Sequence, residues 1–341
     1  MFGKKKTKVD PSQDLKNQPV PEGSHLLEVD DLKMYFHTQD GVVKAVDGVS
    51  YTLDRGETLG VVGESGSGKS VTSLTIMGLI DMPPGRIEGG DVRYRGQSLL
   101  KMSEAQMQQI RGNDIAMIFQ DPMTSLNPVI TVGEQIMEVI RLHDKKISKK
   151  DAYTKACEML ELVGIKADRA GDYPHQFSGG MKQRVIIAMA LACNPRLLIA
   201  DEPTTALDVT IQAQVLELMR KLKAKYQTSM IMITHDLGIV AEICDYVAVM
   251  YAGEIVEYGN REQLFHRPSH PYTKGLFACI PNLMEEETTL IPIEGMTPDP
   301  TNLPTGCRFH PRCPYATEEC SKTNPASKEI ENGHHVKCLH I

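Results

Sequence analysis

The sequence predicts an α/β fold in which buried strands alternate with helices, and two observations support this. Short apolar runs at 58–62, 115–119, 196–201 and 229–234 have the length and composition of buried strands. Helix-compatible stretches follow most of these runs, and a glycine-rich loop follows the first. Ligand sites gather at the carboxyl ends of such strands in open α/β sheets, so candidate functional residues are expected there.

The glycine-rich loop matches the phosphate-binding pattern G-x-x-x-x-G-K-[ST] and lies between a strand and a helix, as that pattern requires. Its glycines permit backbone torsions closed to residues with a Cβ, so successive N–H groups can surround a phosphate. Lys69 is expected to contact the β and γ phosphates, and Ser70 to hold magnesium. A chance glycine-rich turn is the alternative, but the later motifs presuppose a bound nucleotide. The predicted nucleotide-binding residues here are Gly63, Glu64, Ser65, Gly66, Ser67, Gly68, Lys69, Ser70 and Val71.

Composition narrows the class of protein. The chain has 341 residues, a formal net charge of -7 and a pI near 5.9, which predicts more than one domain and argues against nucleic acid as the main partner. We find no secretory signal, and the longest wholly apolar run, 185–193, is shorter than the roughly 20 residues that a membrane-spanning helix needs. A cytoplasmic protein without a membrane span is expected.

Residues 1–25 are polar and proline-containing, and a disordered tail is expected there. Strands are expected at 26–36 and 42–53, forming a β layer before the loop. Phe36 is favoured slightly over Tyr35 as the ring that stacks on a purine, although either aromatic could belong to the core. After the loop we expect a helix over 70–80, ended by the prolines that follow, and then a strand pair with a turn at Gly89 and Gly90.

Residues from about 123 to 177 have helical texture and are predicted to form an inserted helical subdomain. Ser178, Gly179 and Gly180 then open a further helix. A serine and two glycines at a helix start present bare N–H groups and the positive end of the helix dipole, which predicts a second phosphate site.

Four polar side chains follow the other buried strands. Gln120 can coordinate a metal ion or a water molecule, and Asp201 is placed to hold magnesium through water. Glu202 is expected to orient or deprotonate an attacking water, and His235 to assist at the end of its strand. Asp208 belongs to the tight turn that precedes a helix over 209–225, and it is predicted to contact the nucleotide.

These motifs, in this order, resemble the ATP-binding subunits of ABC transporters. The resemblance implies a P-loop NTPase (RecA-like) core with an N-terminal antiparallel β layer, ATP hydrolysis with Mg²⁺, and an ABC ATPase domain at 26–265. It also implies head-to-tail dimerisation, in which each ATP lies between one subunit's P-loop and the other's Ser178-Gly179-Gly180 signature. The signature departs from the commonest form at Met181, which cannot make the hydrogen bonds of a glutamine.

Further motifs at 45–50, 119–128 and 270–274 resemble the peptide and nickel importer group, and within it the D-type ATPase of oligopeptide or dipeptide permeases. This implies a second, related ATPase subunit, two integral-membrane permease subunits and an extracytoplasmic solute-binding protein, with the chain peripheral on the cytoplasmic face of the membrane. Import of nickel or another small solute stays open. A non-transport ATPase of this type, acting on nucleic acid or ribosomes, and a simple P-loop kinase are disfavoured by the single module and by the second phosphate site.

The last part of the chain, 266–341, is expected to be a cysteine-rich extension. Four of its thiols suit a soft metal rather than disulfides in a reducing compartment, although their spacing does not match a common zinc ribbon. The resemblance implies a [4Fe-4S] cluster with a structural role, and zinc or free thiols are the alternatives. The predicted ligands are Cys307, Cys313, Cys320 and Cys338, with His310, His334, His335 and His340 as bystanders.

Overall fold

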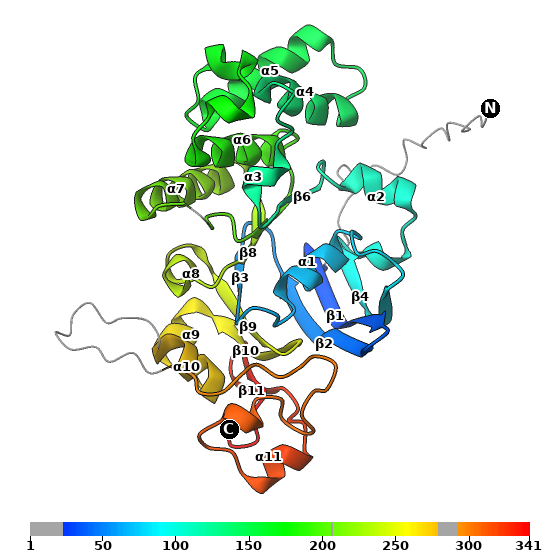
Figure 1. The fold of residues 1–341 in the computed structure, drawn as a ribbon, viewed down its shortest axis with the longest axis vertical. Coiled ribbons are helices and arrows are strands. Elements are labelled where there is room, and N and C mark those ends of the chain that lie inside the picture. Colours follow the sequence, from blue (N-terminus) through cyan, green and yellow to red (C-terminus); the bar gives the residue numbers. More distant parts are fainter. Residues whose placement is uncertain (1–22, 206, 279–291) are drawn as a thin grey trace, which may run out of the picture.

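A computed structural model describes residues 23–341, except residue 206 and residues 279–291. Within this part a sheet of order β11-β12-β10-β9-β3-β8-β7-β6 runs through the centre of the molecule (Figure 1). Its five neighbouring strands from β9 to β6 are parallel, which confirms the predicted α/β class. These parallel strands are β3 (Thr58–Val62), β6 (Ile115–Ile118), β7 (Leu197–Asp201), β8 (Ser229–Ile233) and β9 (Tyr246–Tyr251).

The predicted N-terminal β layer is an antiparallel sheet of order β2-β1-β4-β5. Its strands are β1 (Leu27–Thr38), β2 (Gly41–Leu53), β4 (Gly85–Tyr94) and β5 (Gln97–Ser98). The turn predicted at Gly89 and Gly90 is wrong, because β4 continues through both residues. Gly90 has a φ of 81° beside Asp31, and a Cβ at this position would lie 2.3 Å from the carbonyl oxygen of Asp31. The glycine therefore allows a close approach between two strands.

The helix after the P-loop, α1 (Lys69–Ile76), ends before the prolines that were expected to end it. Gly78 adopts a left-handed conformation with a φ of 60°, and its N–H donates to the carbonyl of Thr75 at 3.0 Å. The N–H of Leu79 donates to the carbonyl of Leu74 at 2.9 Å. This pair of bonds is the Schellman arrangement, in which a glycine satisfies the last carbonyls of a helix.

The region after β6 is helical, as predicted, and lies apart from the antiparallel sheet in Figure 1. Side-chain caps from Thr131, Ser148, Ser178 and Asp208 accept backbone N–H groups at the starts of its longer helices. These caps explain why the helices begin where they do. The helices are α3 (Pro122–Ser125), α4 (Val132–His143), α5 (Lys149–Leu162), α6 (Gly179–Leu191) and α7 (Val209–Tyr226), with short turns η4 (Ala167–Gly171) and η5 (Pro174–Gln176).

The C-terminal elements extend the molecule at the end opposite α4 and α5 (Figure 1). β12 (His334–Val336) pairs with β10 (Glu254–Asn260), and β11 (Lys328–Glu331) pairs with β12, so the C-terminal residues continue the central sheet. No helix among the described residues is long and apolar enough to cross a membrane. The other elements are η3 (Leu99–Lys101), α2 (Glu104–Ile110), α8 (Leu237–Ile243), α9 (Arg261–His266), α10 (Pro271–Ala278), η6 (His310–Arg312) and α11 (Glu318–Lys322).

Two hydrophobic cores lie on the two faces of the central sheet. One contains β1, β2 and β4 with α1, and the other contains the packed faces of α4 to α8. The domain boundaries at 26, 265 and 266 and the limits of the helical subdomain stay predictions. Most of the predicted tail, residues 1–22, lies outside the described residues.

Candidate functional site

The predicted site residues follow neighbouring parallel strands. β3 leads into the P-loop, β6 into Gln120, β7 into Asp201 and Glu202, and β8 into His235. Because the carboxyl ends of parallel strands meet at one edge of a sheet, these side chains come close together. The structure places Gln120 and His235 each in contact with Glu202 and puts Asp201 beside Ser70.

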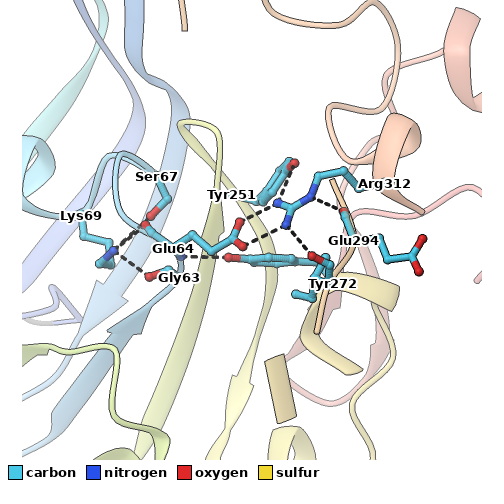
Figure 2. Close-up of polar contacts among 9 residues, drawn as sticks. Gly63, Glu64, Ser67, Lys69, Tyr251, Tyr272, Glu294 and Arg312 are labelled. Atoms are coloured by element: carbon cyan, nitrogen blue, oxygen red, sulfur yellow. Dashed lines mark hydrogen bonds and ion pairs between the residues drawn. The ribbon is translucent and has the colours of Figure 1, made fainter. Parts of the chain in front are cut away.

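The P-loop is closed around the Lys69 ammonium group, as Figure 2 shows. The Nζ atom donates to the carbonyls of Gly63 and Glu64, both at 2.8 Å, and to Oγ of Ser67 at 3.3 Å. Burial lowers the pKa of Lys69, and the nearby Glu202, Asp201 and Glu64 carboxylates oppose that effect. The loop therefore holds a buried cation at the start of a helix, where phosphate oxygens are favoured.

Two loop positions require glycine for packing as well as for conformation. Gly63 and Gly68 have φ values of 150° and 103°. A Cβ at Gly63 would lie 2.1 Å from the carbonyl oxygen of Met250, and one at Gly68 would lie 2.4 Å from that of Ala45. The loop path is thus fixed by close contact with neighbouring backbone, which agrees with a rigid phosphate-binding loop.

Asp201 has the properties of a magnesium ligand. Its side chain is hydrogen-bonded to Ser70, and burial raises its pKa, an effect to which the neighbouring Glu202 adds. Its Oδ1 atom is buried and has no hydrogen-bond partner among the described residues. A buried carboxylate oxygen without a partner is costly unless a cation binds it, and oxygen ligands are those that Mg²⁺ prefers. The donor set therefore fits magnesium, which would neutralise phosphate charge here.

Glu202 is held by three side chains at the end of β7. Its Oε2 atom accepts hydrogen bonds from Gln120 Nε2 at 3.2 Å and from Thr205 Oγ1 at 3.0 Å, and its Oε1 atom lies 3.4 Å from Nδ1 of His235. Burial raises the pKa of Glu202, but these three contacts outweigh burial and hold the pKa below its usual value. Glu202 also has a positive φ of 49°, a conformation that costs about 1–3 kcal/mol in a non-glycine residue and clusters at functional sites.

The signature motif is a separate site within the chain. Ser178 caps α6, and its Oγ atom accepts the N–H of Met181 at 3.4 Å. Gly180 is buried against α7, where an added Cβ would lie 2.4 Å from Cγ2 of Ile211. The α6 and α1 helices lie well apart in Figure 1, so the P-loop and the predicted second phosphate site are separate within one chain.

Asp208 caps α7 by accepting the N–H of Ile211 at 3.0 Å. The neighbouring residue 206, part of the turn that the sequence singled out, lies outside the described residues. Asp208 therefore marks the start of α7. Its predicted contact with nucleotide stays a prediction.

The two candidate aromatic residues lie in different settings. The Tyr35 hydroxyl donates to Oδ1 of Asp47 at 2.6 Å, and burial together with this bond raises its pKa. Phe36 is partly buried against the core of the antiparallel sheet. Stacking of Phe36 on adenine stays a prediction.

The four cysteines predicted to bind metal are neighbours within the C-terminal region. The Cys307 N–H donates to the carbonyl of Cys320 at 2.8 Å. Burial raises the pKa of the Cys307 and Cys313 thiols, and the nearby thiols add to this effect. Across residues 23–341 without the two gaps, no three His, Cys, Asp or Glu side chains converge as metal ligands. The donor chemistry suits a soft metal, but the described geometry does not form its ligand shell.

The histidines of this region differ in their surroundings. His334 lies 2.8 Å from Oε1 of Glu257, and both side chains are buried. His340 instead lies with its Nε2 atom 3.3 Å from the Cys320 sulfur. His340 therefore contacts a predicted ligand, although the sequence analysis treated it as a bystander.

Sequence reasoning missed three residues that contact the site. Thr205 donates to Glu202, whereas Tyr272 and Arg312, from the C-terminal region, contact Glu64 of the P-loop. Tyr272 lies in the 270–274 motif, which pointed to a family but not to this contact. No local signal marked Arg312, because its partner lies 248 positions away.

A parallel sheet with a P-loop, a buried aspartate beside the loop serine and a glutamate at the adjoining strand end defines a P-loop nucleoside triphosphatase. The family model described as ABC transporter matches residues 46–205, and that of the oligopeptide/dipeptide transporter C-terminal region matches residues 256–320. The chain belongs to the ATP-binding subunits of ABC transporters, in the oligopeptide and dipeptide branch, and is an ATPase.

Similar proteins agree with this assignment. The chain is 56% identical to the oligopeptide transport ATP-binding protein OppD of Bacillus subtilis, over 92% of this chain and 88% of that protein. It is 49% identical to the dipeptide transport ATP-binding protein DppD of Escherichia coli, over 92% and 96%. Among solved structures, the ATP-binding cassette MJ0796, a dimer bound to ADP and phosphate, superimposes with a TM-score of 0.62 at 25% identity, over 69% of this chain and 98% of that one.

Proposed function

We propose that this chain hydrolyses ATP to power the uptake of oligopeptides or dipeptides across the cytoplasmic membrane. The observation that carries the proposal is the match of residues 256–320 to the C-terminal region of oligopeptide/dipeptide transporters, in the same chain as the ABC ATPase match. Relatives that align over 88% or more of this chain are named for oligopeptide or dipeptide transport. Residues 23–341, apart from the gaps, contain no helix that could span a membrane.

The partners we propose are a second, related ATPase subunit, two integral-membrane permease subunits and an extracytoplasmic solute-binding protein. The chain would then be peripheral, on the cytoplasmic face of the membrane. The separation of the two phosphate-binding motifs supports a site shared between two ATPase subunits. In this arrangement Ser178, Gly179 and Gly180 of one subunit approach the γ-phosphate held by Lys69 of the other.

The proposed chemistry follows from the positions of the side chains. Lys69 and the loop N–H groups bind the phosphates, and Glu202 orients the attacking water. Thr205, Gln120 and His235 hold the Glu202 carboxylate in place. Magnesium, held by Ser70 and Asp201 when bound, supplies charge neutralisation. Gln120 precedes the helical region, so closure around ATP can be passed from the site to a permease helix.

We also propose that Cys307, Cys313, Cys320 and Cys338 hold a [4Fe-4S] cluster with a structural role, with zinc as the alternative. Four neighbouring thiols in a region with few helices and strands support this, since soft ligands suit such metals. Anaerobic purification followed by iron, sulfide and zinc analysis tests the proposal. About four irons and four sulfides per chain are expected. One zinc without sulfide would favour the alternative, and the absence of both would contradict a metal site.

The transport function is tested by purifying the intact complex and reconstituting it in vesicles with its solute-binding protein. ATP-dependent uptake of labelled peptide is expected, and the Glu202→Gln complex should show none. Uptake of nickel but not of peptide would replace the peptide assignment. Co-purification with ribosomes or DNA in place of membrane subunits would overturn the transport function itself.

A further inference from the structure

Two side chains of the C-terminal region form hydrogen bonds with one residue of the P-loop, Glu64 (Figure 2). The Arg312 guanidinium binds the Glu64 carboxylate through two bonds, Nη1 to Oε2 at 2.6 Å and Nη2 to Oε1 at 3.0 Å. The Tyr272 hydroxyl accepts the Glu64 backbone N–H at 2.9 Å. Glu64 is therefore held by side chain and backbone at once.

Arg312 is itself firmly placed, so it can act as a fixed support. Besides its two bonds to Glu64, it donates from Nε to the carbonyl of Glu294 at 2.9 Å and from Nη2 to that of Ile293 at 3.3 Å. Its Nη1 atom also lies 3.4 Å from the Tyr251 hydroxyl. These bonds use all five N–H donors that a guanidinium carries, and the side chain is only 5% exposed. A lysine could not reproduce this planar fork.

Glu64 connects this support to the phosphate-binding lysine. Its carbonyl accepts a hydrogen bond from Lys69 Nζ, whereas its carboxylate faces Arg312 on the other side of the loop (Figure 2). A shift of Glu64 would therefore move an acceptor that positions the Lys69 ammonium group. Among the described residues no hydrogen bond or ion pair joins Arg312 to Lys69, so we expect its influence on that group to pass through Glu64.

We propose that Arg312 is a positioning residue for ATP binding, through which the C-terminal region holds the P-loop ready for the nucleotide and sets its affinity. The inference rests on ATP binding at the P-loop and not on the proposed peptide transport. Tyr272 supports the same loop from its backbone side. The first part of the P-loop is thus braced by a region of the chain that lies outside the ABC family match.

The test is a double-mutant cycle on ATP binding, measured with a fluorescent ATP analogue under conditions without hydrolysis. Arg312→Ala and Glu64→Ala are each expected to weaken ATP binding about tenfold, because each removes the hydrogen-bonded ion pair that positions Glu64. The double variant should bind about as weakly as either single variant, because both remove the same contact. A double variant whose loss of ATP affinity equals the product of the two single losses would overturn the proposal. So would an Arg312→Ala variant that binds ATP within twofold of wild type.

Further variants separate an effect on ATP affinity from an effect on folding. Arg267→Ala removes another arginine of the C-terminal region, whose partner Glu331 lies at 3.0 Å on the surface, and it should leave affinity unchanged. Arg312→Lys and Glu64→Gln keep side-chain size and decide the matter if Arg312→Ala does not fold, with affinity intermediate between wild type and alanine expected. A lower melting temperature with unchanged affinity of the folded protein would mean a purely structural role. Failure of the wild type to bind ATP would instead contradict the ATPase assignment.

Discussion

The Nε2 atom of Gln120 lies 3.2 Å from Oε2 of Glu202, and this contact joins the end of β6 to the end of β7. Gln120 is followed directly by the helical region, whereas Glu202 follows Asp201, the predicted magnesium ligand. A change in the position of the helical region therefore bears on the carboxylate that we place beside the attacking water.

Replacing Glu202 by glutamine should separate ATP binding from hydrolysis. The amide keeps the shape of the side chain but is a far weaker base, so we expect turnover to fall by about 100-fold or more while ATP affinity is retained. Phosphate release and nucleotide binding measure the two effects. Glu217→Gln, on the exposed side of α7, is the matched control and should retain full turnover. Normal hydrolysis by Glu202→Gln would rule out the role given to Glu202.

Replacing Gly180 by alanine should disturb the signature helix by steric overlap. The new Cβ would lie 2.4 Å from Cγ2 of Ile211, so α6 must move relative to α7 at a cost of about 1–3 kcal/mol. Hydrolysis should fall with it, because Ser178 and the signature move as well. The variant Gly180→Ala with Ile211→Ala removes the overlap and should recover part of both losses. If Ile211→Ala recovers neither, the overlap is not the cause.

Acid should weaken the C-terminal region through His270. Burial lowers the pKa of His270 to about 4, and its Nδ1 atom accepts the N–H of Tyr272 at 3.1 Å. The charge of nearby Lys274 is a second, smaller cause of this lowered pKa, and Glu257 accepts the His270 backbone N–H at 2.9 Å. In the unfolded chain His270 takes up a proton as the pH falls through its ordinary pKa of about 6.5. In the folded chain the same side chain stays neutral until the pH nears 4. Stability from this group is thus full above pH 6.5 and is lost as pH falls toward 4.

The expected loss between pH 7 and pH 5 is about 2 kcal/mol from this one residue. Urea unfolding at both pH values measures it. His270→Asn keeps an acceptor for the Tyr272 N–H without a titrating group, so its stability should depend less on pH over this range. An equal pH dependence in both proteins would contradict the prediction.

Replacing Arg308 by alanine should destabilise the protein strongly. Its guanidinium forms ion pairs with Asp47 and with Glu254, the latter at 3.2 Å, and all three side chains are largely buried. Removing the cation leaves Asp47 without its charge partner, at a cost of about 3 kcal/mol or more in unfolding free energy. Arg86→Ala removes an exposed arginine paired with Glu88 and should cost about 1 kcal/mol or less. Similar losses in both variants, measured by chemical denaturation, would refute the argument.

Local chemistry explains how much of the fold was predictable. The strand Thr58–Val62 has the predicted limits because an apolar run ends at the P-loop glycine, and the site residues at strand ends follow from parallel pairing. The predicted end of α1 and the predicted turn within β4 were wrong. Both errors concern glycines in a left-handed conformation: Gly78 ends the helix α1, and Gly90 allows β4 to pass close to the backbone of Asp31. Glycine marks such places, but the sequence does not say which kind each one is.

The sequence by itself determined the class of site, because phosphate binding and water activation need particular residue types at fixed local spacing. Lys69, Ser70, Asp201 and Glu202 are recognisable for this reason. Only the tertiary structure decided that Glu64 is held by Tyr272 and Arg312, and that Glu202 is held by Gln120 and Thr205. The pairing of Glu64 with Arg312 spans 248 positions and depends on how the C-terminal region packs beside the P-loop, which no local pattern of residues encodes.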